Sequence, residues 1–308
     1  MKYRILIPVL FVFSLTSCNE ITAQKILAEK SFNLENIKSL DVRGKFCNIE
    51  LNGTSGANLK MNGYIKGSGN PERYEIKYEK RGDHVEVWVE TPSSVVWGNI
   101  QSLIEFEVPE NVDIRIDNSS GNLKASNIKS RNINLETSSG NIEVEDIAGE
   151  MKINCSSGNV SVENQMGVTW ITTTSGNIKI REVNGDAIIK ASSGNININD
   201  QTGKMNARCT SGNITLHDLK GALTAETSSG NIKGDEILLN DDSEFRVTSG
   251  NIRLELLNNE NDLSFDLEAG SGNLRAAGNT GEDHMIIKKG EIKISGISSS
   301  GNQTYITR

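Results

Sequence analysis

The sequence predicts an all-β protein: a right-handed parallel β-solenoid, resembling a single-stranded β-helix, with about 18 residues per coil. Three observations predict this fold. A Ser-Gly-Asn phrase recurs at a nearly fixed period, apolar residues alternate after each phrase, and the last of four prolines is Pro109. Because proline cannot donate to a β ladder, a long glycine-rich stretch without proline favours strands that are paired on both sides.

The N-terminus has the features of a lipoprotein signal peptide. Lys2 and Arg4 precede a short apolar run and then small residues, the order typical of a secretory signal. Cys18 directly follows those small residues, which resembles a bacterial lipobox. The resemblance implies cleavage before Cys18 and acylation of that cysteine, and two or three acyl chains would anchor the protein firmly. The alternative is an ordinary signal peptide with a chance cysteine.

These features divide the first part of the chain. We expect a signal peptide over residues 1–17 and a tether over 18–30. Asn19 stands where an aspartate would indicate retention in the inner membrane in some bacteria. We therefore expect a cell-envelope location at the outer membrane, on either its surface or its periplasmic side.

Residues 31–110 contain alternating apolar segments and are expected to start the solenoid and to cover its first coil. Two hairpin turns are predicted, at Asn52-Gly53 and at Arg81-Gly82-Asp83. Arg-Gly-Asp is also a tripeptide that some integrins bind, but a hairpin needs a turn at this position. The turn is therefore the preferred interpretation.

Residues 111–308 carry the repeat. Its glycines are spaced by 19, 18, 18, 18, 18, 18, 20, 22 and 29 residues, at Gly121, Gly140, Gly158, Gly176, Gly194, Gly212, Gly230, Gly250, Gly272 and Gly301. A period near 20 indicates stacked supersecondary units. Pairs such as Ile142/Val144 alternate as in strands, and a second glycine follows nine residues after the first in five units. Each coil is therefore predicted to hold two short strands, with residues one period apart about 4.8 Å from each other.

The winding is expected to be right-handed and the ends irregular. A left-handed solenoid would show a six-residue apolar period, which this sequence lacks, and parallel crossovers favour the right hand. After Gly230 the spacing becomes uneven. Atypical ends are needed because a bare coil is an open sheet edge.

The corner phrase has a structural explanation. Glycine supplies a positive φ without a Cβ clash, and stacked asparagine amides can bond to the coils above and below. We expect this turn role for the ten glycines and for the asparagines that follow them, including Asn122, Asn141, Asn159, Asn177, Asn195, Asn213 and Asn231.

Tandem Ser-Ser-Gly-Asn-Ile-x-Val units behind a lipobox resemble the bacterial putative-adhesin repeat family, a domain of unknown function. The resemblance covers about residues 35–305. It implies a right-handed β-solenoid and an envelope location, and it implies no catalytic residues. The irregular units after Gly230 depart from its pattern.

Composition excludes some functions. A formal net charge of −8 argues against a nucleic-acid partner. The three histidines are far apart in sequence, so no metal site built on histidine is expected. A calcium β-roll needs aspartate in its glycine turns, whereas Ser-Gly-Asn-Ile stands here. An acidic column six residues after the glycines is interpreted as solvated turn positions: Asp146, Glu182, Asp200, Asp218 and Glu236, with Asn164 among them.

The cysteines and one tryptophan are further candidates for sites. Cys155 and Cys209 fall in one column three coils apart, about 14 Å, which is too far for a disulfide, so both are expected to be buried thiols. Cys47 has no evident partner. Trp170 lies at an outward position beside Ile188 and is a weak candidate for stacking on a sugar ring, although covering adjacent aliphatic surface is the simpler role.

We therefore expect a non-enzymatic, lipid-anchored envelope protein without a cofactor. Its partners would be the membrane, through the anchor, and a glycan or protein ligand, as for an adhesin or a binding scaffold. One alternative is a periplasmic structural or envelope-homeostasis module. A second is a polysaccharide lyase, which needs acids and a base in a cleft walled by long loops, whereas the regular coils have short turns.

Overall fold

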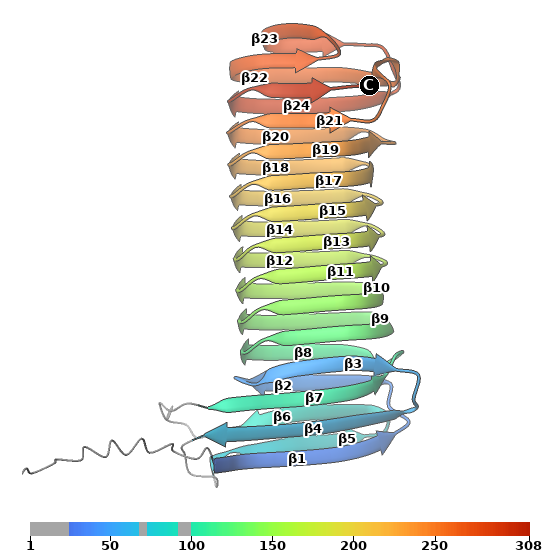
Figure 1. Ribbon diagram of the computed structural model, residues 1–308, viewed down its shortest axis with the longest axis vertical. Coiled ribbons are helices and arrows are strands. Elements are labelled where there is room, and N and C mark those ends of the chain that lie inside the picture. The colour runs from blue at the N-terminus through green and yellow to red at the C-terminus, as the bar shows by residue number, and fades with distance from the viewer. Residues whose placement is uncertain (1–24, 68–72, 92–99) are drawn as a thin grey trace, which may run out of the picture.

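The computed structural model describes residues 25–67, 73–91 and 100–308, and these form an all-β stack of coils (Figure 1). The predicted signal peptide and Cys18 lie outside the described residues. Residues 25–30, assigned to the tether from sequence, instead form the first half of strand β1 (Lys25–Glu35). Among the described residues, no helix is long and apolar enough to cross a membrane.

The regular coils have two faces, each a parallel ladder of strands (Figure 1). Face A contains β11 (Val160–Met166), β13 (Ile178–Asn184), β15 (Ile196–Thr202), β17 (Ile214–Gly221), β19 (Ile232–Leu239) and β21 (Ile252–Leu256). Face B contains β12 (Thr169–Ser175), β14 (Ala187–Ser193), β16 (Met205–Ser211), β18 (Leu223–Ser229) and β20 (Ser243–Ser249). Two long strands, β9 (Leu123–Ser139) and β10 (Ile142–Ser157), contribute to both faces.

Residues eighteen apart are direct partners from β10 to β19 on face A and from β10 to β18 on face B, and the last step on each face is twenty residues. On face A, Ile142, Val160, Ile178 and Ile196 follow one another in the ladder, and each is at most 1% exposed. The side chains that point inward from both faces form one continuous core, which is mostly aliphatic and includes a few buried polar residues such as Gln165 and Gln201. This confirms the predicted stacking and follows from the two-residue alternation of strands.

The glycine corners stack directly on one another. A Cβ at Gly194 would lie 2.1 Å from the carbonyl oxygen of Gly176, and the φ of Gly194 is +127°. The acidic column marks a second left-handed position, with φ between 51° and 57° at Asp146, Glu182, Asp200, Asp218 and Glu236. Asn and Asp tolerate this backbone better than most residues, which explains why Asn164 can share the column.

The asparagines form a continuous ladder. The Oδ1 atom of each accepts a hydrogen bond from the backbone N–H of the asparagine in the next coil; for example, Asn195 N donates to Asn177 Oδ1 at 2.9 Å. The same bond joins Asn48, Asn122, Asn141, Asn159, Asn177, Asn195, Asn213, Asn231, Asn251, Asn302 and Asn273 in that order. The predicted ladder is confirmed, with backbone N–H groups as its main donors.

At the N-terminal end, the stacking order differs from the chain order. This end contains β1, β2 (Ser39–Lys45), β3 (Asn48–Thr54), β4 (Asn58–Gly67), β5 (Glu75–Arg81), β6 (His84–Glu90), β7 (Gln101–Pro109) and β8 (Asp113–Ser120). The coil made by β2 and β3 lies between β6 and β7 on one side and β8 and β9 on the other. Three antiparallel pairings close this end: β1 with β4, β4 with β7, and β5 with β6.

One of the two predicted hairpin turns is confirmed. Arg81 pairs with His84 across the turn between β5 and β6. The turn predicted at Asn52-Gly53 is wrong, because both residues lie inside β3, where Asn52 pairs with Glu107 and Gly53 with Val108 in a parallel ladder.

The C-terminal end shows the same inversion of order. It contains β22 (Leu263–Ala276), β23 (Asn279–Ile287), β24 (Ile292–Ser300) and β25 (Gln303–Ile306), and a short 3₁₀ turn at Glu260–Asp262 precedes β22. The last coil in sequence, β24 and β25, is inserted between β20–β21 and β22. Strand β23 pairs antiparallel with β22 and closes the stack.

Candidate functional surface

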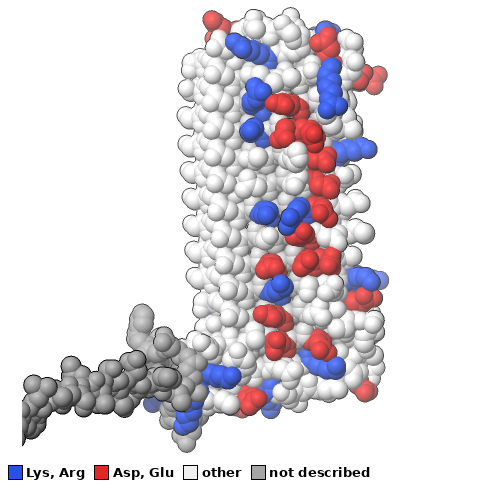
Figure 2. Space-filling view, in the orientation of Figure 1, with Lys and Arg blue, Asp and Glu red and all other residues white. Residues whose placement is uncertain are grey.

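The corner phrases form one straight, uncharged edge of the stack. Hydroxyl-bearing residues one coil apart are partners there, as Ser175, Ser193 and Ser211 are, and the side chains are exposed. Figure 2 shows no acidic or basic side chain along the left-hand border of the regular coils, where the strands of face B end. This edge therefore presents hydroxyl and amide groups at a spacing of about 4.8 Å.

Face A carries a line of acidic side chains, visible in Figure 2 as a red column along the stack. We call the residues Asp146, Glu182, Asp200, Asp218 and Glu236 the acidic ridge. Beside the ridge, the Nδ1 atom of His217 lies 2.6 Å from Asp235 Oδ2. The hydrogen bond to Asp235 raises the pKa of His217 above its ordinary value, because the carboxylate stabilises the imidazolium.

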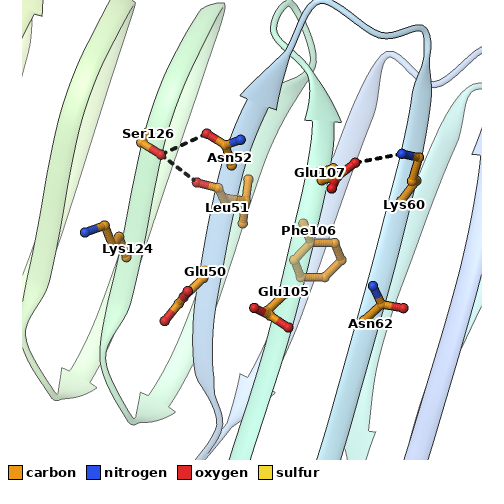
Figure 3. A pocket seen from close by; sticks show the side chains of 10 residues that line it. All are labelled: Glu50, Leu51, Asn52, Lys60, Asn62, Glu105, Phe106, Glu107, Lys124 and Ser126. Carbon is orange, nitrogen blue, oxygen red and sulfur yellow. Dashed lines mark hydrogen bonds and ion pairs between the residues drawn. The ribbon is translucent and has the colours of Figure 1, made fainter.

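A shallow groove of about 290 Å³ lies where face A meets the antiparallel strand β4 (Figure 3). Glu50 and Glu105 are ladder partners at its centre, and Lys124 and Lys60 lie on either side. Lys60 pairs with Glu107 at 2.8 Å. The groove thus offers charged and amide groups that can hydrogen-bond to a polar ligand.

Lysine charges on this surface are partly neutralised. Lys124 Nζ lies 3.0 Å from Glu143 Oε1 in the adjacent coil, and this contact raises the pKa of Lys124. Among the described residues, neither Glu50 nor Glu105 has a basic side chain within ion-pair distance. The described residues that line the groove include no arrangement of nucleophile, base and orienting group.

Trp170 lies on face B in the register expected from sequence. Its ladder neighbours are Lys152 and Ile188, and Asn206 follows Ile188. Both Trp170 and Ile188 are half-buried. Part of the Trp170 side chain is therefore accessible to solvent on face B.

The described cysteines are buried free thiols. Cys155, Thr173, Ala191 and Cys209 follow one another in one column, beneath the glycine corners. The Cys209 thiol contacts the carbonyl oxygen of Gly194 at 3.2 Å. Burial raises the pKa of all three thiols, that of Cys47 to about 11, which disfavours the reactive thiolate.

The histidines lie in three different parts of the stack, each beside a polar side chain. His84 is 2.8 Å from Ser39 Oγ, and His284 is 3.3 Å from Asp266 Oδ1. The surroundings of His284 were missed from the sequence, because they depend on the hairpin between β22 and β23. The turn at Ala277-Gly278 is the local signal that could have indicated it.

Comparison with known proteins gives a family and a fold. The family model described as Toastrack DUF4097 matches residues 37–209 and 201–304. A crystal structure named as a putative lipid binding protein from Parabacteroides distasonis has a TM-score of 0.52 and 15% identity, over 74% of this chain and 96% of that chain. No curated protein matches the sequence.

Two further solved structures are named as putative adhesins. The structure from Bacteroides fragilis has a TM-score of 0.36 and 12% identity, over 91% of this chain and 97% of that chain. The structure from Parabacteroides merdae has a TM-score of 0.35 and 11% identity, over 74% and 96%.

Proposed function

The chain belongs to the Toastrack DUF4097 family, and from this premise we propose that it is a non-enzymatic, lipid-anchored protein of the cell envelope. In this proposal, the rod displays a binding surface for a glycan or a protein, as an adhesin or a scaffold does. The membrane anchor would be the acylated Cys18.

The observation that carries the proposal is the repetition of the surface. The asparagine ladder and the hydroxyl columns present the same groups at every regular coil, along one straight edge. A single hydroxyl or amide contact is weak in water. The binding free energies of contacts repeated on a rigid support add up, because the translational freedom of the ligand is lost only once. Such a surface suits a ligand that is itself periodic, such as a polysaccharide.

The proposed anchor would set the orientation of the rod. Strand β1 begins at Lys25 and belongs to the N-terminal end of the stack, seven positions after Cys18 in sequence. The C-terminal end would therefore point away from the membrane. Substituting Cys18→Ala should move the protein from the membrane fraction to the soluble fraction, and unchanged membrane association would contradict the anchor.

The same proposal includes the finer geometry of the fold, namely right-handed winding and a coil of about 18 residues. The support is the eighteen-residue register on both faces and the preference of parallel crossovers for the right hand. A crystal structure with left-handed coils would contradict it.

Binding is tested by pull-down of the purified protein on insoluble polysaccharides and on immobilised matrix proteins. The variant Ser193→Glu/Ser211→Glu places two charges on the uncharged edge, and Asn184→Glu/Thr202→Glu places two at exposed positions on the opposite edge. We expect the first variant to lose most of its binding and the second to keep it. Equal binding by the two variants would exclude the edge as the contact surface.

Two assays distinguish the alternatives. Protease treatment of intact cells should cleave the protein if it is displayed on the surface, whereas protection would favour the periplasmic structural module. Incubation with acidic polysaccharides should release no unsaturated products, and their release would identify a lyase.

A further inference from the structure

We propose that the C-terminal end of the stack holds a divalent transition-metal ion of the zinc class, bound by Asp266, Glu268 and His284. Asp266 and Glu268 lie on strand β22, and His284 lies on β23, the antiparallel strand that closes the stack. One ligand atom from each of the three side chains lies within 4.8 Å of the other two.

The backbone holds the three residues together. Glu268 and His284 are direct partners in the β22–β23 ladder, and Asp266 stands two residues before Glu268, so it points to the same side of the strand. Strand β22 is paired on both sides, with β23 and with β24. The two carboxylates are therefore carried by a strand with limited freedom to move apart.

The distances suit a small ion. His284 Nε2 lies 3.3 Å from Asp266 Oδ1. Two ligands of a tetrahedral zinc ion, each bound at about 2.0–2.1 Å, are separated by about 3.3–3.4 Å. The ion could therefore replace the hydrogen bond between these two atoms with little rearrangement, and Glu268 would close the set by a rotamer change.

The donor set indicates the kind of metal. One imidazole nitrogen and two carboxylates suit zinc and its neighbours in the first transition series. Calcium and magnesium prefer oxygen ligands throughout and gain little from an imidazole. Three protein ligands leave a fourth position for water or for a group from a binding partner.

Lys293 forms an ion pair with one of the three side chains. Its Nζ atom is 2.8 Å from Asp266 Oδ2, the oxygen that does not face His284. A hydrogen bond to the free oxygen of a ligating carboxylate is a common way to orient it. The side chains of Asp266 and His284 are 35% and 50% exposed, so a metal ion can reach them from solvent.

His217 provides a matched control, because it also has two acidic neighbours. Asp235 lies 2.6 Å from its Nδ1 atom, whereas Glu236 lies 3.9 Å from its Nε2 atom. The two carboxylates therefore flank opposite nitrogens of the ring and cannot share one ion with the imidazole. His284 differs from His217 because one of its ring nitrogens lies close to two carboxylates, those of Asp266 and Glu268.

The test is a calorimetric titration of the metal-free full chain with Zn²⁺ at pH 7.5, repeated with Co²⁺, whose absorption reports coordination by nitrogen and oxygen. We expect one equivalent of Zn²⁺ to bind. His284→Ala and Glu268→Gln should each weaken the affinity about tenfold or more, and His217→Ala should leave it within about twofold. The three substituted side chains are at least partly exposed, so these variants should fold.

Hydrogen exchange gives a readout that a non-specific surface ion would not produce. Zn²⁺ should slow amide exchange in β22 and β23, because the ion joins the closing strand to its neighbour, and should not do so in His284→Ala. The proposal is overturned if no saturable binding is seen up to 1 mM Zn²⁺, or if His284→Ala binds as the unaltered chain does. Neither result would affect the proposed edge binding, which is measured without metal.

Discussion

The corner glycines are the residues on which the close stacking of the coils depends. At Gly194, an added methyl group would meet the backbone carbonyl of Gly176 at 2.1 Å, in a left-handed conformation with φ +127°. The clash cannot be relieved by a side-chain rotation, because the obstructing atom belongs to the backbone of the preceding coil, and the left-handed φ adds a separate strain. Gly82, in the β5–β6 turn, also has a positive φ, of +66°, but a methyl group added there would meet nothing within 4 Å.

The contrast gives a quantitative prediction. Gly194→Ala should lower the free energy of unfolding by about 3 kcal/mol or more, because backbone strain and overpacking each cost about 1–3 kcal/mol. Gly82→Ala should cost only about 1 kcal/mol, the penalty for a left-handed alanine without a clash. Urea unfolding followed by circular dichroism measures both. Equal losses for the two variants would show that the glycine stack is not closely packed.

His217 gives a prediction on pH. Asp235 raises the folded-state pKa of His217, so the pair stabilises the fold below the unfolded-state pKa of about 6.5, and this contribution is lost as the pH rises through the folded value. In an NMR titration, Asp235→Asn should lower the pKa of His217, because it removes the carboxylate that stabilises the imidazolium.

The effect of this pair on stability should be small. The side chains of His217 and Asp235 are 45% and 39% exposed, so solvent screening limits the contribution to about 0.5 kcal/mol. The stability difference between the unaltered chain and Asp235→Asn should be larger at pH 5.5 than at pH 8.5. The opposite order would contradict the sign of the shift.

At the scale of the strand and the coil, the register makes one period a removable unit. Deleting residues 177–194 joins Gly176 to Asn195, so that Ile196 would stack on Val160 and every column would be kept. Deleting residues 177–185, half a period, would instead bring strands of face B into the ladder of face A. The longer deletion therefore keeps the register of the ladder, whereas the shorter one changes it.

We expect the eighteen-residue deletion to fold and the nine-residue deletion to fail. When one whole coil is removed, the stack loses only the stability that this coil and its contacts with its neighbours contribute. When half a coil is removed, strands of one face enter the ladder of the other face, and polar side chains are placed in the core. Circular dichroism and amide exchange measure the outcome. A folded nine-residue deletion would contradict the assignment of two distinct faces.

The ends of the stack explain where prediction from sequence stopped. The columns of the regular coils were predictable because each partner lies a fixed number of residues away, as Ile142 and Val160 do. The insertion of β24–β25 beside β20–β21 was not, because Ser249 pairs with Ser300, 51 residues later, and no local pattern encodes that choice. Asn52-Gly53 was misassigned for the same reason, since β3 is held in place by β7 and β9.

The same limit applies to the candidate surface. The uncharged edge follows directly from the repeated phrase, and the outward position of Trp170 follows from strand alternation. The groove forms where Glu50 of β3 pairs with Glu105 of β7, and strands β4 to β6 lie between these two strands in the sequence. Asp266 and His284 are likewise brought together only by the closing hairpin.

At the scale of the whole molecule, charge is distributed unevenly over the face shown in Figure 2, which has an uncharged edge and an acidic line. From Glu182 to Glu236, successive members of the acidic ridge are one coil apart, about 4.8 Å along the stack, so their carboxylates repel one another. At Asn164 the column is interrupted, and its amide donates a hydrogen bond to Asp146. An amide at a ridge position thus relieves repulsion and keeps the left-handed backbone.

Replacing Asp200, which lies between Glu182 and Asp218, should therefore stabilise the rod. Asp200→Asn keeps the φ of +57° accessible and removes one charge from the column. We expect a gain of about 0.2–1 kcal/mol in the free energy of unfolding at 20 mM NaCl, because like charges opposite each other destabilise a sheet by this amount. At 500 mM NaCl the gain should shrink, because the screening length falls well below 10 Å.

Glu150→Gln is the control, because the ladder partner of Glu150 is the uncharged Asn132. It should change stability by less than about 0.5 kcal/mol at either salt concentration. Urea unfolding of the three proteins at both concentrations separates repulsion along the ridge from a general effect of net charge. If Asp200→Asn and Glu150→Gln respond to salt equally, the ridge does not act as a column, and the acidic side chains are independent solvated turn residues.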